Sequence, residues 1–216
     1  MTMDKKNRFI KTIVFDLGGV YFTRGTYLAI IKLMDLYNID NFFLLYEIFG
    51  DRYQKEGYLL RKGLISLDEF KMRVGEKLQI PREDHEHIIK IWFGSYLPHY
   101  RIEELVKDLS QDYRLVIFSG NIKERVHFLN QRYGFLKFFN DWVFSYDYQK
   151  NKNDIEFYKE LLKHINCHPS EALLIDDELK NVKIGQSVGL NAIQYYYTEH
   201  LIEQLQKLNI KFNLEN

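Results

Sequence analysis

The first strong pattern in the sequence is the run KTIVFDL, Lys11–Leu17, which is closed by Gly18 and Gly19. β-Branched and aromatic residues in so short a run, bounded by glycine, predict a buried strand rather than a helix. Four later runs have the same character and predict four more strands: Tyr113–Ser119, Asp141–Ser145, Glu171–Asp177 and Asn191–Tyr197.

Helical patterns separate the later strands. Asn121 is a candidate N-cap for a helix that runs through Val126, and Asp154 is one for a helix that carries Phe157 on its apolar face. Strand and helix alternate from Tyr113 onward, which predicts an α/β protein with a parallel sheet and helices on both faces.

The segment 25–97 breaks this alternation. It contains no convincing strand, and its apolar-periodic stretches predict four helices over Tyr27–Tyr37, Asn41–Phe49, Ser66–Leu78 and Arg82–Phe93. Ser66 and Glu69 form a capping-box pattern at the start of one of them. We therefore expect a core built from residues 1–24 and 98–216, with the helical segment inserted between its two parts.

Composition and charge exclude several classes of protein. Among 216 residues, 30 basic and 30 acidic side chains give a formal net charge of +0, which argues against nucleic acid or an anionic membrane surface as a partner. The single cysteine, Cys167, excludes an intrachain disulfide and a Cys-rich zinc site. No apolar stretch approaches the roughly 20 residues of a membrane span, and residues 1–9 lack the apolar region of a signal peptide. We expect a cytoplasmic, enzyme-sized protein that is a monomer or a weak dimer.

The ends of the predicted strands carry a distinctive set of polar residues. Asp16 ends the first strand, Ser119 the second, and Asp176 and Asp177 the fourth, while Lys152 follows the third. Ligands bind outside the carboxyl ends of the strands in an open parallel sheet. Carboxylates there suit Mg²⁺, and a carboxylate can also attack phosphorus. Lysine and serine can hold the phosphoryl oxygens, so the pattern indicates phosphate chemistry with a hard cation.

Four motifs resemble those of the haloacid dehalogenase-like hydrolase superfamily. They are FDLGGV, FSGN, KND and LLIDDELKNV, at Phe15–Val20, Phe118–Asn121, Lys152–Asp154 and Leu173–Val182. Each motif alone is weak, but the four occur in the family's order and spacing over nearly the whole chain. The resemblance implies a Rossmann-like core with a helical cap inserted soon after the first strand, where the helical segment 25–97 lies.

The resemblance also implies a role for each matching residue, in a hydrolase that acts on a small phosphorylated metabolite with Mg²⁺ as cofactor. Asp16 would be the nucleophile and a metal ligand, Asp177 a direct metal ligand, Lys152 the charge-stabilising lysine and Ser119 a phosphate ligand. The remaining implied residues line the phosphate site or support the acidic loop, and they are Gly120, Asn121, Asp176 and Asn181.

Two positions depart from the family's pattern. Gly18 stands where phosphatases of the family usually carry a second aspartate as general acid/base. Its backbone carbonyl can still bind the metal, but side-chain proton transfer, typically worth about 10²–10⁴ in rate, is lost. Asn153 follows Lys152 where proline is usual, so we expect a looser loop around this lysine.

The sequence leaves three functions open. The first is a Mg²⁺-dependent phosphatase that forms an aspartyl-phosphate on Asp16. The second is a haloacid dehalogenase in which Asp16 attacks carbon without a metal, and the pair Asp176 and Asp177 argues against it. The third is a non-catalytic protein that binds a phosphorylated ligand, and Gly18 and Asn153 favour it, since fold alone does not establish activity.

Overall fold

A five-stranded parallel sheet lies at the centre of the protein, in a computed structural model that describes residues 10–51 and 54–214. The order of the strands across the sheet is β3-β2-β1-β4-β5. Their bounds are β1 (Thr12–Phe15), β2 (Arg114–Ser119), β3 (Asp141–Phe144), β4 (Ala172–Asp176) and β5 (Asn191–Gln194). Each strand lies within a run that the sequence predicts, and the α/β fold with a parallel Rossmann-like sheet is confirmed.

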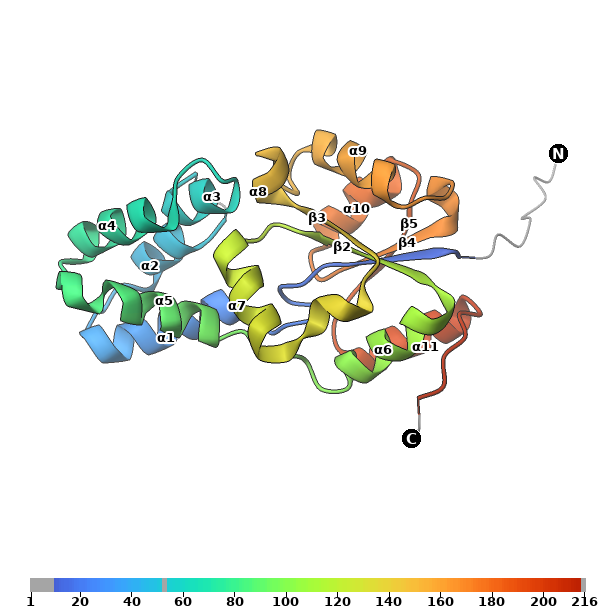
Figure 1. Cartoon of the computed structure of the whole chain (residues 1–216), viewed down its shortest axis with the longest axis horizontal. Helices are drawn as coiled ribbons and strands as arrows, with labels where there is room; N and C mark the ends of the chain where they lie inside the picture. The colour runs from blue at the N-terminus through green and yellow to red at the C-terminus, as the bar shows by residue number, and fades with distance from the viewer. Residues whose placement is uncertain (1–9, 52–53, 215–216) are drawn as a thin grey trace.

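Helices cover both faces of the sheet (Figure 1). One face carries α6 (Ile102–Asp112), α7 (Lys123–Tyr133) and α11 (Thr198–Lys207), and the other carries α9 (Ile155–His164) and α10 (Leu179–Ser187). The alternation of side chains along β1 produces this arrangement, because Ile13 and Phe15 belong to the first apolar cluster and Val14 to the second. Central strands buried on both faces explain why the runs are apolar throughout.

The described residues between β1 and β2 form helices and no strand of the sheet. Five of these helices lie to one side of the sheet, and they are α1 (Gly25–Tyr37), α2 (Phe42–Phe49), α3 (Glu56–Arg61), α4 (Leu67–Leu78) and α5 (His85–Gly94). Phe49, Phe70 and Trp92 pack together among them, with ring centroids 4.9–5.6 Å apart. Four of the helices match predicted stretches, whereas α3 was not predicted because six residues are too few to show a helical period.

The predicted helix caps have mixed outcomes. Ser66 and Asp154 each accept a hydrogen bond from a backbone N–H in the first turn of α4 and α9, as expected. The prediction that Asn121 caps the following helix is wrong, because α7 begins after Ile122. The amide oxygen of Asn121 instead accepts hydrogen bonds from the Ile122 N–H and from Arg125 Nε, at 2.9 and 2.8 Å.

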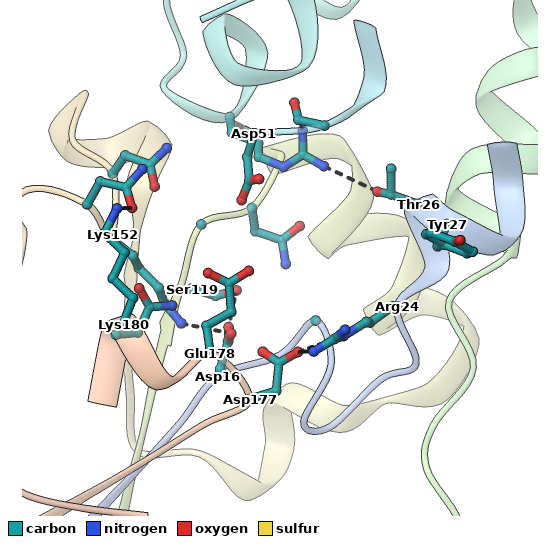
Figure 2. Close-up of a pocket in the computed structure, with 18 of the residues that line it drawn as sticks. Asp16, Arg24, Thr26, Tyr27, Asp51, Ser119, Lys152, Asp177, Glu178 and Lys180 are labelled. Carbon is teal, nitrogen blue, oxygen red and sulfur yellow. Dashed lines mark hydrogen bonds and ion pairs between the residues drawn. The ribbon is translucent and has the colours of Figure 1, made fainter. Parts of the chain in front are cut away.

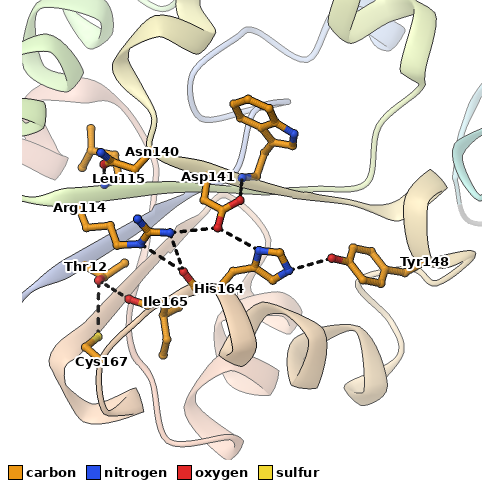
Figure 3. A network of polar contacts seen from close by, with 10 residues as sticks. Thr12, Arg114, Leu115, Asn140, Asp141, Tyr148, His164, Ile165 and Cys167 are labelled. Atoms are coloured by element: carbon orange, nitrogen blue, oxygen red, sulfur yellow. Dashed lines mark hydrogen bonds and ion pairs between the residues drawn. The ribbon is translucent and has the colours of Figure 1, made fainter.

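A polar network fastens the first residues of β2 and β3 to α9, at the end of the sheet opposite the predicted site (Figure 3). Arg114 Nη2 lies 3.0 Å from Asp141 Oδ2, and the same carboxylate oxygen lies 3.1 Å from His164 Nδ1. His164 Nε2 is in turn 2.8 Å from the hydroxyl of Tyr148, the last residue of α8 (Ser145–Tyr148). These contacts fix the edge strand β3, and they leave the carboxyl ends of the strands free for chemistry.

No helix in the described ranges combines the length and the apolar character that crossing a membrane requires. The N-terminal residues 1–9, on which the expectation about a signal peptide rests, lie outside the described residues. The cytoplasmic location stays a prediction.

Candidate active site

A cavity of about 830 Å³ lies where β1, β2 and β4 end, and Figure 2 shows it from close by. Asp16 directly follows β1, and Ser119 and Asp176 are the last residues of β2 and β4. Residues predicted for the site line the cavity, namely Asp16, Gly18, Ser119, Gly120, Asn121, Lys152, Asp177 and Asn181. Asp176 lies behind Lys152 and is fully buried. The structure thus brings the predicted site residues together, although they come from distant parts of the chain.

Lys152 lies between two carboxylates. Its Nζ is 2.8 Å from Asp16 Oδ2 and 2.7 Å from Asp176 Oδ2, and the residue is only 6% exposed. Burial by itself would lower the pKa of Lys152, but the two carboxylates outweigh burial and raise it, so the lysine stays protonated. Asn153, which follows, accepts a hydrogen bond from Lys180 Nζ at 2.6 Å and takes no part in this contact.

Asp16 is held in one orientation by hydrogen bonds to one of its oxygens. Oδ1 accepts from Ser119 Oγ at 3.0 Å and from the Leu17 N–H at 2.7 Å. Burial raises the pKa of Asp16 to about 7, with Lys152 opposing the rise and Asp176 and Asp177 adding to it. The described site therefore contains less positive charge than its carboxylates need, and a further cation would keep Asp16 ionised.

The carboxylates can hold a metal ion. Asp16, Asp176 and Asp177 each offer an oxygen, and these ligand atoms lie within 4.8 Å of one another. Oxygen ligands are those that Mg²⁺ takes in proteins. Asp176 is fully buried and bonded on both oxygens, Oδ1 to Asn181 Nδ2 at 3.0 Å and Oδ2 to Lys152, whereas Asp16 and Asp177 line the cavity. The donor set fits a hard divalent cation, with Asp16 and Asp177 the carboxylates most available to it.

Two residues that the sequence analysis missed contact Asp177. Arg24 places Nη2 at 2.7 Å and Nε at 2.9 Å from Asp177 Oδ2. Gly19 has a φ of +90°, and a Cβ built on it would lie 2.2 Å from the same oxygen, so only glycine leaves room for this carboxylate. The Gly18-Gly19 pair after the first strand marks Gly19 as a residue of interest in the sequence. Nothing in the local sequence distinguishes Arg24 from a solvated arginine.

The helical segment supplies the opposite wall of the cavity. Tyr27 of α1, Asp51 after α2 and Arg61 at the end of α3 line it, and Figure 2 shows Tyr27 and Asp51 across from Asp16. Arg125 of α7 also lines the cavity and was not predicted. The two arginines both lie close to the ring of Trp92 on α5, a relationship that no sequence motif encodes.

Known proteins resemble the chain over most of its length. A protein of Dictyostelium discoideum is 30% identical over 185 residues, which cover 83% of this chain and 77% of that protein. A sesquiterpene phosphatase of Aspergillus oryzae is 26% identical over 182 residues, which cover 83% of this chain and 87% of that protein.

Solved structures share the fold. A HAD family enzyme of Bacteroides thetaiotaomicron, in complex with magnesium and inorganic phosphate, has a TM-score of 0.69 at 22% identity, covering 89% of this chain and 98% of that one. Residues 67–195 match the family model described as haloacid dehalogenase-like hydrolase. The chain belongs to the haloacid dehalogenase-like hydrolase family.

Proposed function

We propose that the protein is a Mg²⁺-dependent phosphatase that hydrolyses a small phosphomonoester through an aspartyl-phosphate on Asp16. The observation that carries this proposal is the position of Lys152 Nζ, within 2.8 Å of both Asp16 and Asp176, beside a cavity that Asp177 also lines. A phosphatase among the relatives and a neighbour of the same fold solved with magnesium and phosphate agree with it.

The reaction has two displacements at phosphorus. Oδ2 of Asp16 attacks phosphorus in line and the bond from phosphorus to the ester oxygen breaks, so the leaving group departs as an oxyanion that takes a proton from solvent water. Lys152 and Ser119 hold the equatorial oxygens, with Gly120 and Asn121 lining the phosphate position. Water then attacks phosphorus, the bond to Asp16 breaks, and inorganic phosphate and the free carboxylate result.

The metal would be held by Asp16, Asp177 and the backbone carbonyl of Gly18. When bound, Mg²⁺ neutralises charge on the phosphoryl oxygens. Asp176 supports the site through Lys152, and Asn181 orients Asp176 through the 3.0 Å hydrogen bond described above.

The helical segment 25–97 would serve as a cap on a core formed by residues 1–24 and 98–216. Its residues Tyr27, Asp51 and Arg61 share the cavity with Asp16. A cap in this place would exclude water and choose among substrates by its contacts with their alcohol part.

Carbon–halogen hydrolysis is the weaker alternative. It needs a carboxylate nucleophile but no metal. The cluster of Asp16, Asp176 and Asp177 would then concentrate negative charge that the reaction does not require. The two reactions differ in their dependence on a divalent cation, so one experiment separates them.

The test is phosphate release from an aryl phosphate, measured with Mg²⁺ and with EDTA. An aryl leaving group needs little protonation, so the missing acid at Gly18 matters least there. Turnover is expected to vanish with EDTA and in Asp16→Asn, while Asp112→Asn, an exposed aspartate at the end of α6, keeps the wild-type rate. Turnover that survives both EDTA and Asp16→Asn would contradict the proposal.

A further inference from the structure

Two arginines in the cavity wall are buried without a carboxylate partner. Arg61 is 5% exposed and Arg125 is 2% exposed, and both line the cavity that contains Asp16. Arg61 Nη1 donates to the backbone carbonyls of Phe49, Gly50 and Gly57 at 2.8–3.2 Å. Neither guanidinium forms an ion pair with any residue that the structure describes.

Aromatic rings and neutral groups surround the two charges instead. The guanidinium carbons lie 5.4 Å (Arg61) and 5.5 Å (Arg125) from the ring centroid of Trp92, and that of Arg125 lies 4.4 Å from the ring of Tyr96. Burial lowers the pKa of Arg125 to about 10 and Arg61 adds to the fall, while Tyr96, Asp51 and Asp16 oppose it. Burying a cation without a counter-ion is costly, and buried charges in proteins are normally paired.

The hydrogen bonds around Thr26 decide which of the Thr26 and Tyr96 hydroxyl groups donates to the other. Trp92 Nε1 and Arg61 Nη2 can only donate, and both donate to Thr26 Oγ1, at 2.9 and 3.3 Å. Figure 2 shows the bond that reaches Thr26. The Thr26 hydroxyl must therefore donate to Tyr96 Oη, 2.7 Å away, which also accepts from Arg125 Nη1 at 2.8 Å. The proton of the Tyr96 hydroxyl is left without a partner among the described residues.

Asn121 and Arg125 add further free donors. The amide oxygen of Asn121 is occupied by the Ile122 N–H and Arg125 Nε, so only its NH₂ group remains. Nη2 of Arg125 has no partner within the described ranges. Tyr96, Arg125 and Asn121 thus offer donors and no free acceptor, and the carboxylate of Asp51 lines the same cavity. A carboxylate or phosphate group, which only accepts, matches such a surface, and arginine binds either one in a bidentate manner.

We infer that this wall is a binding site for a second acidic group of the substrate, so that the alcohol part of the phosphomonoester carries a carboxylate or a phosphate of its own. The inference rests on the proposed function, which places the reacting phosphoryl group at Asp16. Tyr96 and Arg125 bind the second anion directly, and Arg61 supports them through Thr26.

The experiment compares esters that differ only in the second acidic group. Carboxyalkyl phosphates and bisphosphates of short diols are measured against alkyl phosphates of equal chain length, and the two acidic series show which anion is taken. At one chain length, an acidic ester is expected to have kcat/KM about tenfold or more above its alkyl match, because charge-assisted hydrogen bonds are lost without it. Equal values for acidic and alkyl esters throughout would overturn the inference.

Two variants locate the effect. Arg125→Met is expected to lower kcat/KM for the preferred acidic ester about tenfold more than for its alkyl match, and Tyr96→Phe, which removes only the hydroxyl, lowers it in the same sense by less. If Arg125→Met does not fold, Tyr96→Phe carries the test. Arg132→Met, exposed on the same helix, should change neither value. Equal losses for both esters would mean that these donors hold the transferred phosphoryl group, and the inference would be wrong.

Calorimetry with Asp16→Asn separates failure of this inference from failure of the phosphatase proposal. Tighter binding of the acidic ester than of its alkyl match, lost on adding Arg125→Met, supports the second-anion site even if no ester is hydrolysed. Equal binding of the two esters overturns the site even if the enzyme is a phosphatase.

Discussion

The guanidinium of Arg24 lies 2.7 Å from the Asp177 carboxylate, at the place where the proposed metal ligand needs a positive charge. The Arg24 side chain is 70% exposed although that of Asp177 is only 9% exposed, so solvent weakens the ion pair from the arginine side and a divalent cation can displace it. Arg24 immediately precedes α1, so the pair also joins the start of the helical segment to the acidic loop after β4.

Arg24→Ala is therefore expected to tighten Mg²⁺ binding, because the cation no longer competes with the arginine for Asp177. The range of exposed ion-pair energies corresponds to a gain of about twofold to fivefold. Titration calorimetry of the wild type and the variant measures it directly, without turnover. Arg73→Ala, which breaks an ion pair with Glu69 on α4, is the control. Weaker Mg²⁺ binding in Arg24→Ala would show that the arginine assists the site instead of competing.

Gly19→Ala should weaken Mg²⁺ binding by displacing Asp177. The new Cβ would meet the carboxylate at 2.2–2.9 Å, and the positive φ of +90° adds a backbone cost of about 1 kcal/mol. Gly134→Ala is the matched control, because it has a φ of +62° but its Cβ would find only Lys137 Nζ at 3.7 Å. Both variants should lose stability in urea through the backbone cost, Gly19→Ala by more because of the added clash, and only Gly19→Ala should lose metal affinity. Equal affinities in the two variants would show that Asp177 is not a ligand.

The strands and the residues attached to them were predictable from the sequence. A strand buried on both faces is a short apolar run, and the residue at its carboxyl end is then fixed at the edge of the sheet. Asp16, Ser119 and Asp176 follow from this rule alone. The place of Lys152 in the site could be predicted only from the order of the motifs, because no local pattern distinguishes a functional lysine in a polar loop from a solvated one.

The contacts that join the helical segment to the core were not predictable. Arg61 and Arg125 share the Trp92 ring only after α3, α5 and α7 have packed, and nothing in the local sequence distinguishes either one from a solvated arginine. Asn121 was expected to cap a helix for the same reason, since its local sequence gives no sign that Arg125 would take its amide oxygen. Packing between distant segments decides the surroundings of the two arginines, whereas Asn121 is bonded within its own segment, to Ile122 and Arg125.

Lys152→Met is expected to destabilise the protein when no metal is present. The change leaves Asp16 and Asp176 buried with no ammonium between them, and breaking a buried pair on one side costs up to about 3–5 kcal/mol. The raised pKa of Lys152 agrees with this expectation, because it means that the folded protein stabilises the charged form of the lysine. The free energy of unfolding in urea with EDTA measures the loss, and Mg²⁺ should restore part of it. Lys159→Met, an exposed lysine paired with Glu156, should change it by less than about 0.5 kcal/mol.

Gly18→Asp should supply the proton donor that the site lacks. The backbone permits a side chain there, because Gly18 has no positive φ and a Cβ would meet only Tyr96 Cε1, at 3.7 Å. An acid beside Asp16 helps a poor leaving group much more than a good one, so the rate on alkyl phosphates should rise relative to aryl phosphates, by up to about 10²-fold. Gly18→Asn has nearly the same shape and cannot donate a proton from a carboxyl group, so it isolates the chemistry from the added bulk. If Gly18→Asp and Gly18→Asn change the alkyl-to-aryl ratio equally, the glycine is not a missing acid, and the native site must protonate the leaving alcohol by another route.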